Sequence, residues 1–301
     1  MNLKYYNLIL SILIGTVLTS CSNNGIEFKE KNQNRLESNN YINNRKINKI
    51  VTLTSLSTDI VANISPDKLV AIPGSSLFKD VAMFDSLPRI SQGRTPPDLE
   101  KIVSLKPDLV VGTKGFHDKI LGKLKDNNIQ TISYELSDWN SLENTINLIS
   151  TKLDINNLKK SNEIINTKLK ECVVANEQNE NPSVVVLAST KPILSPNSKS
   201  WAGNLLQRFG INSLTKDLDS KSEFRGYVNL SPEWLIKEDP DNLIIIQTRP
   251  GQYVDFEKSK PFSNLKAVKS DQVYRFNYYG LINAGSLESI NSACLKLRKI
   301  F

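Results

Sequence analysis

A weak internal repeat constrains the fold of this chain more than any other sequence feature. In the first half, six residues separate Glu100 from Pro107-Asp108, and the apolar run Leu109-Val110-Val111 follows. In the second half, the same spacing leads from Glu233 to Pro240-Asp241 and another apolar run. Each copy is typical of a helix that a proline ends, followed by a buried strand. The recurrence predicts two halves of similar construction.

Both copies carry signals for the start of a helix. Thr95 and Ser231 are N-cap residue types, and Pro96 and Pro232 suit the first helical position. A carboxylate in the first turn is favoured by the helix dipole, and this local role is one interpretation of the two glutamates. Their recurrence at matching places favours another interpretation, in which they form a pair of docking points.

Strand-like runs alternate with segments of helical period, which predicts an α/β architecture with mostly parallel sheets. These runs lie at 47–53, 69–72, 109–111, 131–134, 184–187, 243–246 and 273–276. Between Ser141 and about Glu177 no such run occurs, and the apolar residues keep helical intervals. There we expect a short helix, a break near Asp154, and a long helix that joins the two halves.

Composition excludes several classes of protein. The chain has 301 residues, a length that suggests two domains or lobes. One histidine and three cysteines cannot supply a zinc site of the usual spacing or a cysteine-ligated iron–sulfur cluster. Apolar residues are not gathered into repeated spans, so a polytopic membrane protein is excluded. A formal net charge of +7, spread over the chain, disfavours nucleic-acid binding.

The amino terminus is typical of an export signal. Lys4 precedes an apolar run from Leu8 to Leu18, and small residues lead to Cys21. Residues 18–21, Leu-Thr-Ser-Cys, resemble the lipobox of bacterial lipoproteins. The resemblance implies a signal peptide over 1–20, cleavage before Cys21, and lipidation of that cysteine. Residues 21–46 form a polar tether, so the protein is expected to be exported and anchored to the cell envelope.

From about residue 47 to the end, the chain resembles the substrate-binding lipoproteins of ABC importers that handle iron complexes, haem and vitamin B12. The segments that carry the resemblance are Lys49–Thr54, Thr58–Ile60, Leu87–Ile90, Leu99–Val110, Trp201–Leu206, Val228–Glu233 and Asp239–Ile244. It implies two Rossmann-like α/β lobes joined by a single long α-helix, the class III periplasmic binding protein fold. The expected divisions are an N-terminal lobe over 47–140, connecting helices over 141–181, and a C-terminal lobe over 182–301.

The resemblance also implies partners. Glu100 and Glu233 match the surface glutamates, one per lobe, that pair with arginines of the importer's permease. Carboxylates accept two-point contacts from arginine, and two such points fix an orientation. The implied partners are a small-molecule iron complex, an ABC permease with its ATPase, and the membrane through the lipid anchor. A monomer is expected.

The same resemblance places the ligand between the lobes, on loops that carry basic, aromatic and hydroxyl side chains. Arginine and lysine can neutralise an anionic ligand, and aromatic rings can cover flat or apolar surface. The candidate ligand-binding residues are Ser75, Ser76, Arg94, Lys114, Trp201, Arg225, Tyr227, Arg249, Tyr278 and Tyr279.

This set favours a ferric siderophore of carboxylate or catecholate type over the other ligands of the class. Haem is an alternative, with Tyr278, Tyr279 or His117 as an axial ligand, although we expect His117 to be an exposed loop residue. Cobalamin is disfavoured because tryptophans do not occupy the matching cleft positions. No compact cluster for bare ferric iron is evident, and no metal site or resident cofactor is expected.

Enzymatic signatures are weak. Gly74-Ser75-Ser76 lacks the following lysine of a phosphate-binding loop, no Gly-x-Ser-x-Gly motif occurs, and His117 is the only possible imidazole base. We therefore expect no enzyme; an envelope enzyme or metal chelatase on the same scaffold is the alternative. Cys172 and Cys294 are either a disulfide, which export permits, or two small buried residues. The sequence leaves that choice open.

Overall fold

The computed structural model describes residues 46–92, 95–153, 157–173, 182–219, 222, 224–247 and 256–301. Residues 46–301 belong to one compact unit. The predicted signal peptide, Cys21 and the tether up to residue 45 lie outside the described residues, as do the candidate ligand residues Arg94 and Arg249.

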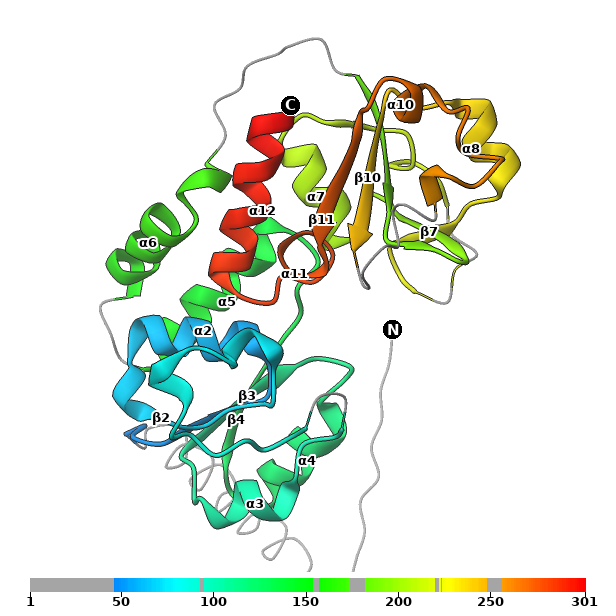
Figure 1. Cartoon of the computed structure of the whole chain (residues 1–301). Helices are drawn as coiled ribbons and strands as arrows, with labels where there is room; N and C mark the ends of the chain where they lie inside the picture. The colour runs from blue at the N-terminus through cyan, green and yellow to red at the C-terminus, as the bar shows by residue number, and fades with distance from the viewer. Residues whose placement is uncertain are drawn as a thin grey trace, which may run out of the picture. The chain divides into compact units, whose positions relative to one another are not determined.

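The first lobe is built on a four-stranded parallel sheet in the order β2-β1-β3-β4 (Figure 1). Its strands are β1 (Ile50–Thr52), β2 (Leu69–Ala71), β3 (Leu109–Thr113) and β4 (Gln130–Tyr134). Every residue of β1 is buried, as expected for a central parallel strand covered on both faces. The strands predicted in this half are therefore confirmed.

In the described part of this lobe, three α-helices and three short 3-10 helices accompany the sheet. The α-helices are α2 (Ser55–Ile64), α3 (Leu99–Ser104) and α4 (Asp118–Asp126), and the 3-10 helices are η1 (Pro66–Lys68), η2 (Ser76–Phe78) and η3 (Ala82–Phe84). Helix α2 begins directly after β1, because the Thr54 hydroxyl caps it by accepting the Ser57 N–H at 3.2 Å.

The second lobe contains a parallel sheet in the order β11-β10-β5-β8 and a small antiparallel sheet in the order β6-β7-β9. The strands are β5 (Ser183–Leu187), β6 (Ser189–Thr190), β7 (Ile193–Pro196), β8 (Asn212–Ser213), β9 (Tyr227–Asn229), β10 (Asn242–Gln247) and β11 (Val273–Asn277). The helices are α7 (Trp201–Arg208), α8 (Pro232–Glu238), α10 (Lys266–Lys269), α11 (Tyr278–Leu281) and α12 (Leu287–Ile300). The strands predicted in this half are confirmed, whereas β6 to β9 were not predicted, because polar residues or proline interrupt any apolar run in them.

The two repeat helices start differently. Ser231 caps α8 as predicted, with its hydroxyl accepting the Trp234 N–H at 3.1 Å and Pro232 at the first position. The predicted cap at Thr95 is wrong, because Asp98 caps α3 by accepting the Lys101 N–H at 3.0 Å. The cause is the Pro96-Pro97 pair, since a residue that precedes proline avoids the helical region.

The connector consists of α5 (Trp139–Lys152), α6 (Asn157–Lys168) and the 3-10 helix η4 (Lys170–Cys172). Helix α5 ends at Lys152, close to the predicted break near Asp154, which itself lies outside the described residues; α5 has 14 residues and α6 has 12. The expectation of a short helix followed by a long one is therefore wrong. The reason lies in η4, which is held to α12 by the Cys172–Cys294 disulfide and by the Glu171 N–H donating to Asn291 Oδ1 at 3.0 Å. The disulfide, with a Cα–Cα distance of 5.1 Å, settles the open choice.

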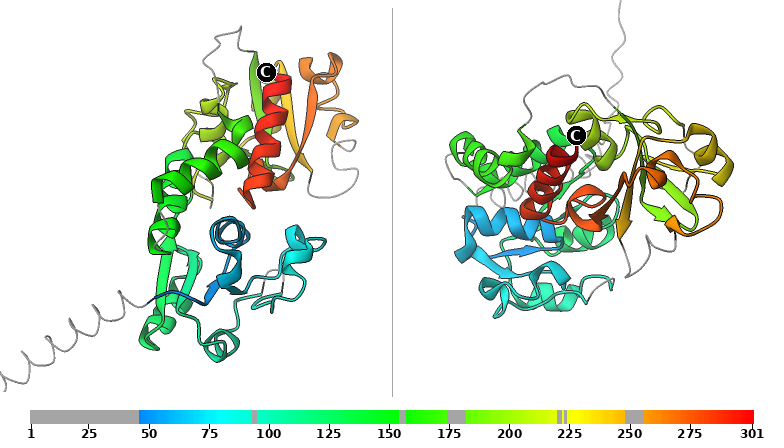
Figure 2. Two further views of the ribbon diagram at one scale, coloured as in Figure 1. Left: turned by 90° about the vertical axis from the view of Figure 1, so that its left-hand side faces the viewer. Right: turned by 45° about the horizontal axis from the view of Figure 1, so that its top comes forward.

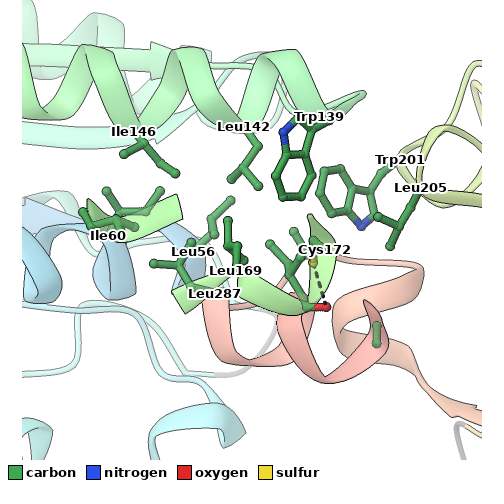
Figure 3. Close-up of a cluster of buried hydrophobic side chains, with 14 of the residues drawn as sticks. Leu56, Ile60, Trp139, Leu142, Ile146, Leu169, Cys172, Trp201, Leu205 and Leu287 are labelled. Atoms are coloured by element: carbon green, nitrogen blue, oxygen red, sulfur yellow. Dashed lines mark hydrogen bonds between the residues drawn. The ribbon is translucent and has the colours of Figure 1, made fainter. Parts of the chain in front are cut away.

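One hydrophobic core runs through both lobes and the connector. Leu56 and Ile60 of α2, Leu142 of α5, and Leu287 of α12 all contribute to it (Figure 3). Helix α12 reaches α2 of the first lobe, beside which it lies in both views of Figure 2. There the Leu287 N–H donates to Asp59 Oδ2 at 2.7 Å.

The Pro-Asp pair of each repeat has the same structural role. Asp108 Oδ2 accepts the Asn48 and Lys49 N–H groups at 2.9 and 3.0 Å, just before β1. Asp241 Oδ2 accepts the Ser183 N–H and hydroxyl, both at 2.8 Å, at the start of β5. Each aspartate thus joins its own strand to the neighbouring strand of the sheet.

We predict that Asp241→Asn lowers the free energy of unfolding by about 1–3 kcal/mol, because an amide places a donor against the Ser183 donors.

The Lys266 side chain, followed by Ser183, lowers the pKa of Asp241 to about 2. A lowered folded-state pKa means that this contribution is present above the ordinary value of 3.8 and is lost as the pH falls through about 2. Denaturant unfolding of wild type and variant between pH 7 and 2 measures it, with exposed Asp85→Asn as control. A constant difference across that range would contradict the assignment.

Candidate functional site

A cleft of about 760 Å³ lies at the carboxyl ends of parallel strands. On one side it is lined by the segments that follow β1, β2, β3 and β4, and on the other by Trp201 and the segment 279–285 after β11. Ligand sites of α/β folds occupy this edge because loops of different strands converge there. The cleft is therefore the candidate site.

Hydroxyl groups dominate the wall that the first lobe contributes. Thr54 Oγ1 lies 2.6 Å from Tyr134 Oη and 2.7 Å from Ser57 Oγ, and the Ser55 hydroxyl donates to Ser75 Oγ at 3.0 Å. Burial raises the pKa of Tyr134 to about 12, so its phenol keeps its proton at neutral pH. Sequence reasoning found Ser75 but missed Thr54, Ser55 and Tyr134, although their place directly after strands β1 and β4 is a usable signal.

The cleft includes about half of the candidate ligand residues. Ser75, Ser76, Lys114, Trp201 and Tyr279 line it. Tyr278, Arg225 and Tyr227 are not among the lining residues, although Arg225 forms an ion pair with the lining residue Glu135.

The aromatic residues differ in how much surface they offer a ligand. Trp201 is 6% exposed, and its indole N–H donates to the Gly280 carbonyl at 2.9 Å, so it forms a fixed wall. Tyr278 is exposed and packs edge-on against Tyr279 at a centroid distance of 5.4 Å. Phe116 lines the cleft with 79% of its surface exposed. Phe116 therefore offers the most free ring surface of these residues.

One carboxylate lies among the basic residues. Glu135, directly after β4, is 3.8 Å from Lys114 Nζ through Oε2 and 3.3 Å from Arg225 Nη1 through Oε1. Lys114 belongs to the first lobe and Arg225 to the second, so this cluster of three charges spans the cleft. Sequence reasoning missed Glu135, although its place after a strand end is again a signal.

His117 is buried, with 4% of its surface exposed, so the expectation of an exposed loop residue is wrong. The Thr113 N–H donates to Nδ1 at 3.1 Å, and Thr113 Oγ1 lies 2.8 Å from the same atom. A backbone N–H can only donate, so Nδ1 carries no proton and the neutral ring carries it on Nε2. An Nε2 that holds a proton cannot ligate iron, which argues against His117 as an axial haem ligand.

The two repeat glutamates are exposed at equivalent places. Glu100 lies in the first turn of α3 and Glu233 in the first turn of α8. The backbone N–H of Glu233, followed by the Ser231 hydroxyl, lowers the pKa of the Glu233 carboxyl. Because Asp98 and Ser231 cap the two helices, neither glutamate is needed as a cap.

Within the described residues, no three or more His, Cys, Asp or Glu side chains are grouped so that they could hold a metal ion. None of the helices in the same part of the chain combines the length and apolarity that a membrane span requires.

Each lobe contains a parallel β-sheet, helices connect the two lobes, and a cleft lies at the ends of the strands. This is the arrangement of a bilobed binding protein. The chain belongs to the periplasmic binding protein family, whose model matches residues 50–278.

Relatives and solved structures agree with this family. The chain is 31% identical over 189 residues to the Fe(3+)-citrate-binding protein YfmC of Bacillus subtilis, in an alignment that covers 60% of this chain and 57% of that relative. It is 25% identical to the putative ABC transporter substrate-binding lipoprotein YhfQ of the same organism, over 97% of this chain and 96% of the relative. A crystal structure from Staphylococcus epidermidis, of a possible iron-binding periplasmic solute-binding protein, has a TM-score of 0.71 at 17% identity. That match covers 85% of this chain and 99% of the other and shows a common fold.

We predict that His117 titrates below its ordinary pKa of 6.5, because burial disfavours the charged ring. A lowered folded-state pKa means that its contribution to stability is present above 6.5 and is lost as the pH falls through the folded value. The chain has one histidine, so NMR of the ring nitrogens assigns both the tautomer and the midpoint without ambiguity. The urea-unfolded protein supplies the reference. A proton on Nδ1, or a midpoint at or above the reference, would contradict the geometry.

Proposed function

We propose that this protein captures an anionic ferric complex of carboxylate or catecholate type in the cleft and delivers it to an ABC permease. The observation that carries the proposal is a pair of cations from opposite lobes: Lys114, which lines the cleft, and Arg225, which contacts the lining residue Glu135. Guanidinium and ammonium groups bind carboxylate or catecholate oxygens strongly where solvent is partly excluded. The likeness to a relative named for Fe(3+)-citrate binding supports the same class of ligand.

The size of the cleft supports a chelate as the ligand. Its volume of about 760 Å³ lies within the range of small-molecule sites, roughly 300–1,000 Å³. The described residues provide no grouped ligands for a bare metal ion, so we propose that iron arrives with its coordination shell already filled. Arg94 and Arg249, the other candidate arginines, lie outside the described residues.

Haem and cobalamin are the alternative ligands. Tyr279 lines the cleft and packs against the exposed Tyr278, so a tyrosine phenolate could ligate haem iron. Cobalamin is the weaker alternative, because Trp201 is the one tryptophan that lines the described cleft and its indole is fixed in the wall.

We also propose that the protein binds without turnover, as a monomer held to the envelope through lipid on Cys21. An envelope enzyme or chelatase that used a histidine base would depend on His117, the one histidine of the sequence. Its imidazole is buried and hydrogen-bonds to Thr113. The likeness to a relative named as a lipoprotein supports the anchor.

A ligand screen tests the proposed class. We predict that ferric citrate or a ferric catecholate quenches the tryptophan fluorescence of the purified protein saturably, and that Lys114→Gln with Arg225→Gln weakens binding at least tenfold. The reason is the loss of two charge-assisted contacts, each worth about 1.5–3 kcal/mol. Lys123→Gln, an exposed lysine of α4 outside the cleft, is the matched control. Saturation by cobalamin or haem alone would overturn the proposal.

A transport assay tests the docking role of Glu100 and Glu233. We predict that the double variant Glu100→Ala and Glu233→Ala abolishes uptake of the ferric complex while the purified protein binds it with unchanged affinity. Both carboxylates are exposed and neither lines the cleft, so ligand binding and docking should separate. Glu238→Ala, at the other end of α8, is the control. Normal uptake by the double variant would contradict the assignment.

A further inference from the structure

The charge cluster formed by Lys114, Glu135 and Arg225 has a feature that an open anion site would lack. Its carboxylate already contacts both cations, with N–O distances of 3.8 Å to Lys114 and 3.3 Å to Arg225. Glu135 and Arg225 are separated by 90 residues in sequence and belong to different lobes. A single carboxylate therefore bridges the cleft.

Backbone contacts hold both sides of this bridge in place. The Lys114 N–H donates to the Tyr134 carbonyl at 2.8 Å, which fixes Lys114 beside Glu135 at paired strand ends. On the other side, the Gly226 carbonyl accepts the Asn197 N–H at 2.9 Å, and Gly226 has a φ of 82°. A Cβ on Gly226 would lie 2.9 Å from the Ser200 backbone, so the turn that presents Arg225 approaches α7 closely.

We propose that Glu135 is a specificity-determining residue that occupies the cleft cations in the empty protein and that an anionic ligand must displace. This inference rests on the proposed function, because it assumes that the ligand is an anion. A ligand carboxylate would take over the contacts of Glu135 to Lys114 and Arg225, and the Glu135 side chain would turn to solvent. No bond forms or breaks in this exchange.

The exchange lowers the apparent affinity for anions and selects ligands with enough charge to replace both contacts. All three side chains are more than half exposed, at 69% for Lys114, 51% for Glu135 and 85% for Arg225. Exposed ion pairs are individually weak, so Glu135 should modulate binding rather than forbid it. Its removal should change the dissociation constant between about 2- and 10-fold.

A double-mutant cycle on the purified protein, with ferric citrate as the probe, tests the exchange. Glu135→Gln is expected to lower the dissociation constant about 2- to 10-fold in the wild-type background and by clearly less in an Arg225→Gln background. Asp67→Asn, which removes an exposed carboxylate at the other end of α2 from the cleft, should change nothing. An equal gain in both backgrounds would indicate general repulsion between Glu135 and the anion. That result, or no gain at all, would overturn the proposal.

A measurement without ligand separates this inference from the proposed function. NMR of the arginine side chains in the ligand-free protein follows the Arg225 guanidinium, whose signals are assigned by their loss in Arg225→Lys. We expect Glu135→Gln to shift the Arg225 side-chain signals and to speed the exchange of their protons with water, and Asp67→Asn to leave them unchanged. Identical Arg225 signals in wild type and Glu135→Gln would overturn the bridge whatever the ligand is. Changed signals in a protein that binds no anionic ferric complex would support the bridge and refute the proposed ligand.

Discussion

The hydrophobic core shared by both lobes is the constraint on which the rest of the structure depends. Residues of α2, α5 and α12 meet in one cluster, together with β-strand residues of both large sheets (Figure 3). Separating the lobes would expose this cluster to water, at about 25 cal/mol per Å² of apolar surface. The disulfide between Cys172 and Cys294 holds η4 to α12, and the Leu287 N–H bonded to Asp59 holds α12 to α2. Covalent, polar and apolar contacts therefore all oppose a large hinge motion.

A cleft between lobes that move little must select its ligand mainly through the side chains at its surface. The first-lobe wall is fixed by hydrogen bonds among Thr54, Tyr134, Ser55 and Ser75, and the opposite wall by the Trp201 indole bonded to Gly280. The long exposed side chains of Lys114, Glu135 and Arg225 are the parts with freedom to rearrange. This division explains why we assign the shape of the site to the walls and its charge selectivity to the exposed cluster.

Sequence reasoning predicted the features that depend on local pattern and missed those that depend on distant partners. Buried strands such as 243–246 have their own signature because parallel strands covered on both faces are continuously apolar. His117 is an exception, because its partner Thr113 is only four residues away; a turn after β3 brings Nδ1 to the Thr113 N–H, and the sequence of this loop did not indicate that turn. The contact of Glu135 with Arg225 could not be predicted from the residues near Glu135 in sequence, because Arg225 belongs to the other lobe. The end of α6 also depends on a distant residue, Cys294 of α12.

The acidic residues of the repeat are of two kinds: the aspartates form hydrogen bonds within the fold, and the glutamates are exposed. Asp108 and Asp241 accept backbone N–H groups at the starts of β1 and β5, so their charge is used within the fold. The helices that precede them are capped by Asp98 and Ser231. Glu100 and Glu233 are therefore exposed charges that are not the N-cap residues of their helices and do not line the cleft. The helix dipole favours a carboxylate at any position of the first turn, so it does not explain why both glutamates occupy the same position. Their equal sequence separation from Pro-Asp instead gives the two carboxylates matching places on matching helices, which agrees with the two-point docking that we propose.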